Sequence, residues 1–325
     1  GTTRLLLAYA AAHNLEIVHA DVHSAFTASD LEIPIFVRMP PHLLDYLVHT
    51  KRITTAQRES MSNYVVELKK SLYGLRSAAH SWNALFHSVL MQSGFTAHPS
   101  FDSCFYTAQG VKNLATGATL LGKCALSLHV DDTICCLENH ESMQLLIANA
   151  KPHFEMTMIR NPKHLLGMAV NVNRSLGTIS ISQTAFISET LARFGQAHSH
   201  PCSTPAELNV MHTLLHDPTK PLNPHEQEES TPLDLTTHPF RALVGSLMWI
   251  ANSTRPDIAY ITNLIARGMS RPTIAHWRAC QRVLRYLAGT KRQGITYSRD
   301  AWWAEVKRTG APIVGFSDAD FAADS

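Results

Sequence analysis

The feature that most constrains this chain is a pair of adjacent aspartates between two apolar runs. In residues 126–136, Asp131 and Asp132 separate two short segments rich in Leu, Val, Ile and Cys. Two apolar runs joined by turn residues predict a β-hairpin. Adjacent carboxylates beside a core repel each other, and their desolvation favours a bound cation. A plain turn remains the alternative, because Asp is a favourable turn residue.

A third carboxylate lies in an alternating segment near the start of the chain. Between residues 17 and 23, small or apolar residues alternate with His19, Asp21 and His23. In a strand these three polar side chains share one face. They could form a transition-metal site, or simply face outward from a half-buried strand. A third possibility is that Asp21 meets the aspartate pair from a neighbouring strand, as in the two-metal sites of polymerases and nucleases.

The composition predicts a globular chain with a large core. Of the 325 residues, 45% are hydrophobic and only 17% are charged, against about 25% charged in a typical domain, which excludes a highly charged disordered protein. The length predicts about two domains. The six cysteines lack Cys-x-x-Cys spacing and are expected to be reduced thiols of an intracellular protein. We expect no secretory signal and no membrane span, because Lys123, His129 and the aspartates interrupt the longest apolar stretch.

Charge is distributed unevenly along the second half. Residues 201–239 contain seven prolines, and six acids stand against one Lys between 207 and 234, which predicts an exposed linker. Residues 240–308 then carry twelve Lys or Arg and three acids. Four arginines recur at spacings that favour one helix face: Arg271, Arg278, Arg282 and Arg285. Such a stripe suits a phosphate backbone, or it is simply a solvated helix face.

Periodicity and capping residues predict mixed α and β structure first and mostly helices afterwards. Strands are expected within 30–39, 124–137 and 177–182, and helices over 77–94, 141–154, 184–194, 240–252, 256–269 and 272–287. Pro256 and Pro272 are each expected at the first helical position, where a missing N–H costs nothing.

Many blocks, in one consistent order, resemble the reverse transcriptase of copia-type LTR retrotransposons. They cover nearly the whole chain: 21–26 with 30–32, Leu68-Lys69-Lys70-Ser71-Leu72-Tyr73-Gly74-Leu75-Arg76 with Trp82, Val130-Asp131-Asp132, 164–168, 181–183, 203–205, 244–248, 254–260, 276–277 and 284–290. Each block alone is a weak signal, but their shared order makes the resemblance specific.

The resemblance implies an α+β fold with the right-hand architecture of polymerases. A palm with partial fingers and the start of the thumb would occupy residues 1–200, followed by the linker at 201–239. A basic, helical thumb or connection region would occupy 240–310. Residues 311–325 resemble the first strand of a truncated ribonuclease H-like domain, with Asp318 as its first acid. Because the sequence ends at Ser325, before the remaining acids, we expect no ribonuclease H activity.

The resemblance also implies the reaction and its ligands. Asp21, Asp131 and Asp132 would coordinate two Mg²⁺ ions for RNA-directed DNA synthesis, a nucleotidyl transfer onto a primer 3′ hydroxyl. The implied partners are an RNA or DNA template with its primer and deoxynucleoside triphosphates, with no membrane partner and an oligomeric state that stays open. The implied location is cytoplasmic, within a particle.

Further binding residues follow from the same blocks. Phe26 matches the family's aromatic gate, which would exclude a ribose 2′-OH, although an ordinary core Phe is the alternative. Gly74 and Arg76 would lie near the template and the incoming nucleotide. The four-arginine stripe would contact the template–primer duplex.

Departures from the family pattern leave functions other than an active polymerase open. Residues 77–80 read Ser-Ala-Ala-His in place of Gln-Ser-Pro-Arg, and His129 stands where the family usually has Tyr. The resemblance also implies a basic fingers segment before Arg4 that this sequence does not contain, so we expect weak binding of the incoming nucleotide and interpret the chain as a fragment or a decaying copy of an element. The chain is therefore either a polymerase domain or a catalytically inactive relic that at most binds nucleic acid. A His-rich metal hydrolase is the third class.

Overall fold

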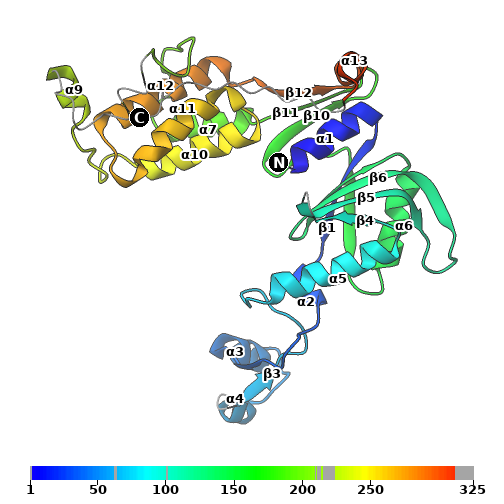
Figure 1. Ribbon diagram of the computed structural model, residues 1–325. Coiled ribbons are helices and arrows are strands. Elements are labelled where there is room, and N and C mark those ends of the chain that lie inside the picture. Colours follow the sequence, from blue (N-terminus) through cyan, green and yellow to red (C-terminus); the bar gives the residue numbers. More distant parts are fainter. Residues whose placement is uncertain are drawn as a thin grey trace. The chain divides into compact units, whose positions relative to one another are not determined.

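The computed structural model describes residues 2–61, 64–99, 102–208, 210, 214 and 224–311 (Figure 1). The chain forms two compact units, Gly1–Asn161 and Pro162–Ser325, each with its own hydrophobic core. The composition places the division at 201–239 instead. The units divide earlier because residues 162–200 form strands and a helix that pair and pack with elements after residue 240.

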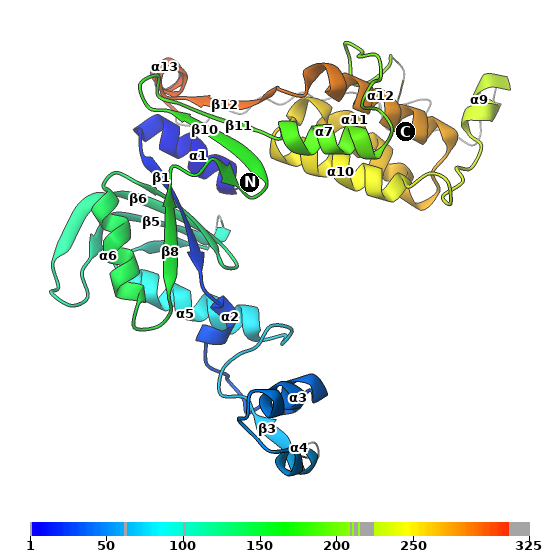
Figure 2. The same cartoon turned by 180° about the vertical axis from the view of Figure 1, so that it is seen from behind.

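The first unit contains a six-stranded antiparallel sheet in the order β4-β5-β6-β7-β1-β8, and Figure 2 shows β8 alongside β1. Its strands are β1 (Glu16–Val22), β4 (Thr96–His98), β5 (Asp102–Lys112), β6 (Thr119–His129), β7 (Asp132–Leu137) and β8 (Met156–Arg160). Its helices are α1 (Thr2–His13), α2 (Ala25–Ala28), α3 (Pro41–His49), α4 (Thr55–Met61), α5 (Ala78–Gln92) and α6 (His140–Ala150). A separate pair joins β2 (Phe36–Arg38) to β3 (Val65–Glu67), so the strand expected within 30–39 is only three residues long.

The two faces of β1 have different surroundings. Val18, Ala20 and Val22 are buried in the core that α5 and α6 form on one face. On the other face Ile17 is buried and Asp21 is exposed. Helix α1 packs on β6 and β7 on this second side, where the Cys136 thiol contacts the Leu6 carbonyl. The strand thus carries its polar end on an open part of the sheet.

The β6–β7 hairpin turns one residue earlier than the sequence predicts. The turn consists of Val130 and Asp131, and Asp132 already pairs with His129 as the first residue of β7. The expected helix at 77–94 is α5, followed by Gly94 in the left-handed region at φ +91°. All six cysteines are free thiols, as expected.

The second unit joins a four-stranded antiparallel sheet, in the order β12-β11-β10-β9, to a group of helices. The strands are β9 (His164–Leu165), β10 (Met168–Asn173), β11 (Thr178–Ser182) and β12 (Gly294–Ser298). The helices are α7 (Thr184–Arg193), α9 (Pro224–Glu229), α10 (Phe240–Ser253), α11 (Ala259–Arg267), α12 (Ile274–Thr290) and α13 (Arg299–Thr309), with 3-10 turns η1 (Pro256–Ile258) and η2 (Gly268–Ser270). The observed mixture of helix and sheet agrees with the expected α+β class.

Two helix starts differ in detail from the expectation. Pro256 does occupy the first position of η1, but the expected helix 256–269 is divided into η1, α11 and η2. Helix α12 begins at Ile274 because Thr273 is its N-cap and forms a capping box with His276, so Pro272 precedes the cap. Arg271 therefore lies before α12 and not on its stripe.

A buried arginine fastens the start of α11 to the end of α12. Arg255 is 1% exposed and forms a two-pronged ion pair with Asp257, with Nε–Oδ1 and Nη2–Oδ2 distances of 2.9 and 2.7 Å. Its guanidinium also donates to the Thr290 carbonyl at 2.9 Å and to the Thr290 hydroxyl at 2.7 Å. The Tyr286 hydroxyl donates to the same Asp257 carboxylate at 2.8 Å. Removing either charge would leave the other poorly compensated.

This ion pair predicts a pH-dependent stability. Burial raises the pKa of Asp257, but hydrogen bonds from Arg255 and Tyr286 outweigh it and hold that pKa below its ordinary value. Such a carboxylate stabilises the fold above its unfolded pKa of about 3.9, and this contribution is lost as the pH falls through the folded value. We expect Asp257→Asn to lower the free energy of unfolding at neutral pH by about 1.5–3 kcal/mol and to flatten its acid dependence.

Urea unfolding followed by circular dichroism, from neutral pH to about pH 3, measures both effects. The control is Asp300→Asn, which removes an 80% exposed aspartate on α13. An acid dependence as steep in Asp257→Asn as in the unchanged chain would contradict the assignment.

Candidate active site

The sheet register brings two of the three predicted catalytic aspartates together. In the β1–β7 pair, Asp21 lies directly opposite Asp132. Side chains of such partners project from the same face, with Cβ atoms about 4.5–5.5 Å apart. Asp131 lies one residue before Asp132, in the hairpin turn. Its carbonyl accepts a hydrogen bond from the Val22 N–H of β1 at 3.3 Å. Asp21 therefore meets the aspartate pair from a neighbouring strand, which was the third of the three possibilities. His23 lies beyond the end of β1 and does not share the face of His19 and Asp21 as a strand residue.

His19 is the nearest identified partner of these carboxylates. Its Nε2 lies 2.8 Å from Oδ1 of Asp132, and its side chain is 22% exposed. Two carboxylates placed directly opposite each other are unfavourable, and a hydrogen bond from an imidazole on the same face fixes one of them. The alternation in β1 places His19 on this face, but its partner on β7 becomes visible only with the register.

The hairpin tip has an unusual backbone that a buried tryptophan holds. Val130 has φ +61°, a region that a β-branched residue rarely adopts and that costs about 1–3 kcal/mol. The indole Nε1 of Trp82, on α5, donates to the Val130 carbonyl at 2.6 Å. Trp82 is 1% exposed and packs against Phe86 and Phe154, with ring centroids 5.5 and 4.9 Å away. The apolar core thereby positions the turn that carries Asp131, a link that the sequence blocks do not reveal.

The three aspartates have the ligand chemistry that Mg²⁺ requires, but their side chains are not arranged around a common point. Carboxylate oxygens are the hard ligands that Mg²⁺ prefers, and at this end of the sheet Asp21 is exposed while Asp131 and Asp132 are half-buried. Within the part of the chain that the structure describes, no three His, Cys, Asp or Glu side chains converge closely enough to hold a metal ion. The backbone brings the three aspartates to one end of the sheet, and their side chains do not converge on a common point there.

The candidate nucleotide-binding residues lie around α2 and the loop before α5. Phe26, on α2, is partly buried, and its ring centroid is 4.7 Å from that of Tyr73. The Ser71 N–H donates to the Ser29 carbonyl at 3.0 Å, which holds this loop beside α2. The structure thus joins two blocks that lie more than forty residues apart in the sequence.

Two further candidates lie in the same loop. Gly74 has φ +98°, which favours glycine, and no neighbouring atom would meet a Cβ there. Arg76 is exposed.

The predicted arginine stripe lies in the second unit, and two of its four members are paired with acids. Arg278 contacts Glu228 and Glu229, and Arg282 contacts Glu207. The sequence shows the basic and acidic runs but not this pairing. The expected ribonuclease H-like strand and Asp318 lie outside the described residues.

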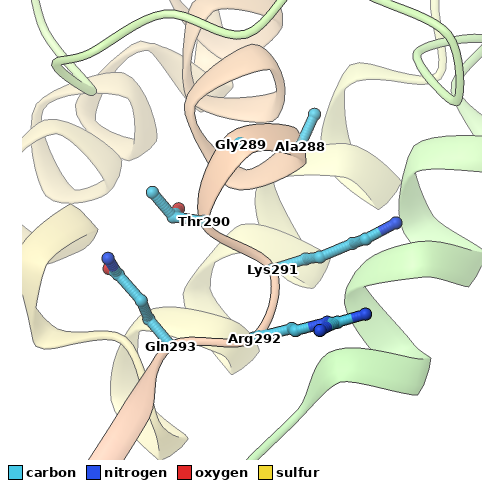
Figure 3. A pocket seen from close by; sticks show the side chains of 6 residues that line it. All are labelled: Ala288, Gly289, Thr290, Lys291, Arg292 and Gln293. Atoms are coloured by element: carbon cyan, nitrogen blue, oxygen red, sulfur yellow. The ribbon is translucent and has the colours of Figure 1, made fainter.

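A second basic feature follows α12. The turn at Lys291 and Arg292 borders a cavity of about 430 Å³, and Figure 3 shows both side chains extending in the same direction while Thr290 and Gln293 point elsewhere. Among the described residues neither cation has an acidic partner.

Comparison with known proteins settles the family. The family described as reverse transcriptase (RNA-dependent DNA polymerase) matches residues 1–208. The chain belongs to this reverse transcriptase family. The Pol polyprotein from transposon TNT 1-94 of Nicotiana tabacum is 29% identical over 99% of this chain and 21% of that polyprotein, and that from transposon RE1 of Arabidopsis thaliana is 27% identical over 99% and 19%. A transposon Ty5-1 protein of Saccharomyces cerevisiae is 26% identical over 85% of this chain and 78% of that protein.

These relatives confirm the resemblance to the reverse transcriptase of copia-type retrotransposons. The chain spans about a fifth of the length of the two plant Pol polyproteins. No solved structure matches. The described helices of this reverse transcriptase family member include none with the length and apolar character to cross a membrane.

The hydrogen bond from Trp82 predicts a selective defect. Trp82→Phe keeps an aromatic ring in the core but removes the donor to the Val130 carbonyl. We expect a loss of about 0.5–1.5 kcal/mol from the hydrogen bond, plus a packing cost, in the free energy of unfolding. Primer extension should fall further than this loss of folded protein accounts for, because the turn that carries Asp131 is no longer fixed.

The matched control is Val89→Ala, which disturbs the same core two turns further along α5 and leaves the ring contacts of Trp82 in place. Both variants are compared by urea unfolding and by primer extension at a temperature where each remains folded. Equal extension per folded molecule in the two variants would show that Trp82 acts only as a core residue.

Proposed function

We propose that this chain is the RNA-directed DNA polymerase domain of a copia-type Pol polyprotein. The observation that carries the proposal is the β1–β7 register, which sets Asp21 opposite Asp132 with Asp131 in the adjoining turn. In this assignment the six-stranded sheet is the palm, and the β2–β3 pair with α3 and α4 is part of the fingers. The helices of the second unit form the thumb or connection region.

The three aspartates would hold two Mg²⁺ ions, which supply activation of the primer 3′ hydroxyl and stabilisation of the pyrophosphate leaving group. The residues of the chain set the geometry. The paired strands fix the backbone of Asp21 and Asp132, and Trp82 fixes the turn below Asp131. His19 restrains one oxygen of Asp132 and leaves the other available.

Selection and binding of substrates are assigned to residues around this end of the first unit. Phe26 would exclude a ribose 2′-OH, as the family resemblance implies, and its contact with Tyr73 restrains the ring. Gly74 and Arg76 would contact the template and the incoming nucleotide. The partners are then a template with its primer and deoxynucleoside triphosphates.

A second candidate is a catalytically inactive relative that binds nucleic acid. The observation that favours it is the engagement of Asp132 with His19, together with the lack of a converged ligand set among the described residues. Such a protein would bind a template in a salt-dependent manner without needing Mg²⁺.

Primer extension with substitutions of the aspartates separates these candidates. On an RNA template with Mg²⁺, we expect Asp21→Asn, Asp131→Asn and Asp132→Asn each to reduce extension to background. The reason is that each removes a charged metal ligand while keeping the side-chain size. Asp45→Asn, an exposed aspartate of α3 that pairs with Arg58, is the matched control and should extend normally.

Template binding by fluorescence anisotropy accompanies each extension assay. Extension by the unchanged chain that survives any of the three substitutions would contradict the two-metal assignment. Binding without extension in the unchanged chain would favour the inactive relative.

The gate assignment predicts altered sugar selection. Phe26→Ala removes the ring that would meet a 2′-OH, so we expect a higher ratio of ribonucleotide to deoxynucleotide incorporation. The measurement is the ratio of kcat/KM for the two nucleotides in single-nucleotide extension. Tyr73→Ala removes the same ring contact but leaves Phe26 in place, and it should change the ratio far less. An unchanged ratio in Phe26→Ala would make Phe26 an ordinary core residue.

A further inference from the structure

The arginine face of α12, defined here as Arg278, Arg282 and Arg285, is occupied by oxygen atoms of the same chain. Arg278 donates from its two terminal nitrogens to Glu229 at 3.0 Å and Glu228 at 2.7 Å. Arg282 donates to the Glu207 carboxylate at 2.7 Å and to the Thr204 hydroxyl at 3.0 Å. Arg285 donates from Nε to the His200 carbonyl at 2.9 Å. Donor groups of the stripe that suits a phosphate backbone are therefore engaged within the chain, although Arg278 and Arg285 remain exposed.

The covering segment, here called the acidic strap, comprises residues 200–208 and 224–233. Backbone hydrogen bonds fasten its second part, residues 224–233, near the start of α12. The Leu233 N–H donates to the Pro272 carbonyl at 2.9 Å, and the Ile274 N–H donates to the Thr231 carbonyl at 3.0 Å. The side-chain pairs along α12 are thus additional to a backbone anchor. Glu228 and Glu229 can therefore leave Arg278 while this second part of the strap stays attached.

The side-chain pairs are of a kind that a phosphate can replace. A guanidinium presents the same planar set of donors to a carboxylate and to a phosphate. Glu207 and Glu228 have side chains 68% and 60% exposed, and exposed ion pairs contribute little net stability. Nucleic acid offers a row of phosphates and releases counterions when arginines bind them. Exchange of carboxylate for phosphate is therefore chemically matched.

A hollow lies between the strap and the helix. Its volume is about 270 Å³, and it is lined by Gln196, Glu207, Arg278, Gln281, Arg282 and Arg285. A water molecule takes about 30 Å³ in the liquid, so the hollow has room for a phosphate group. Arg282 Nε is buried and has no hydrogen-bond partner within the described part of the chain. Three arginines and one acid thus border a space that the strap does not fill.

We propose that the arginine face of α12 is a binding surface for nucleic-acid phosphates, and that the acidic strap covers it until phosphates displace Glu207, Glu228 and Glu229. The inference deepens the nucleic-acid contact of the proposed function, but it does not depend on catalysis. The chain would carry its own competitor for the template, so its affinity would be lower than the arginines alone would give.

The test is binding of a labelled RNA–DNA duplex of arbitrary sequence, measured by fluorescence anisotropy over a series of KCl concentrations. The test variant is Glu207→Gln/Glu228→Gln/Glu229→Gln. The matched control is Glu189→Gln/Asp300→Asn/Glu305→Gln, which changes the net charge equally and removes the partners of Arg299 and Arg308 on α13. We expect the test variant to bind roughly threefold to tenfold tighter than the control at low salt. Its slope of log affinity against log salt should be steeper by about 2, for the two arginines released.

Substitution of the arginines completes the cycle. Arg278→Gln/Arg282→Gln should lower the affinity more in the test variant than in the unchanged chain, because only there are both arginines free. Equal affinity of the test and control variants would overturn the proposal, as would a gain that persists without the two arginines.

Circular dichroism checks that each variant is folded. If the triple substitution unfolds the chain, the double variant of the two exposed acids, Glu207→Gln/Glu228→Gln, is measured against Asp300→Asn/Glu305→Gln with the same criteria. Primer extension is recorded separately, so loss of catalysis in every variant would count against the polymerase and leave the binding result intact.

Discussion

The antiparallel register between β1 and β7 is the constraint on which the rest of the first unit depends. A slip of one residue would turn every side chain of β1 to the opposite face. Asp21 would then enter the core that α5 and α6 form, and Val22 would move to the open face. Burial of Val18, Ala20 and Val22 therefore excludes such a slip and keeps Asp21 on the open face, where the observed register sets it opposite Asp132. The hydrophobic effect, which has no preference for metal ligands, thus keeps the two carboxylates on one face of the sheet.

The strained turn shows how the core reaches the candidate site. Val130 adopts a backbone conformation that would be unfavourable in isolation. The indole of Trp82 and the N–H of Val22 each donate to a carbonyl of the turn, so a helix and a strand hold it from two directions. Two sequence blocks that look independent, one around Trp82 and one around the aspartates, are parts of a single physical unit.

Local sequence patterns predicted most helices and strands, whereas long-range contacts decided the exact turn, the start of α12 and the partner of His19. The alternation from 17 to 23 favoured a strand, and β1 places His19 and Asp21 on one face but ends before His23, while α5 and α10 followed from their periodicity. The turn position was wrong by one residue, because pairing of His129 with Asp132 is set by the neighbouring strand. The start of α12 was wrong because Thr273 caps the helix more effectively than Pro272 can begin it. The bond between His19 and Asp132 joins residues over a hundred positions apart, and no local pattern encodes it.

Arginine side chains perform two different tasks in the second unit, and their exposure to solvent decides which task each performs. Arg255 is almost fully buried, so its pair with Asp257 operates where unpaired charge is costly, and the helix ends it joins cannot separate without exposing that cost. Arg278 and Arg282 are partly exposed, and their partners Glu228 and Glu207 are more so, although Glu229 is only 14% exposed, so water and salt compete for the Arg278–Glu228 and Arg282–Glu207 pairs. A buried pair fixes the fold, whereas an exposed pair with the same geometry can exchange one anion for another. The arginines after residue 240 and the acids before it are therefore paired in a contact that can form and break. Such a reversible contact is what displacement of the acids by a polyanion requires.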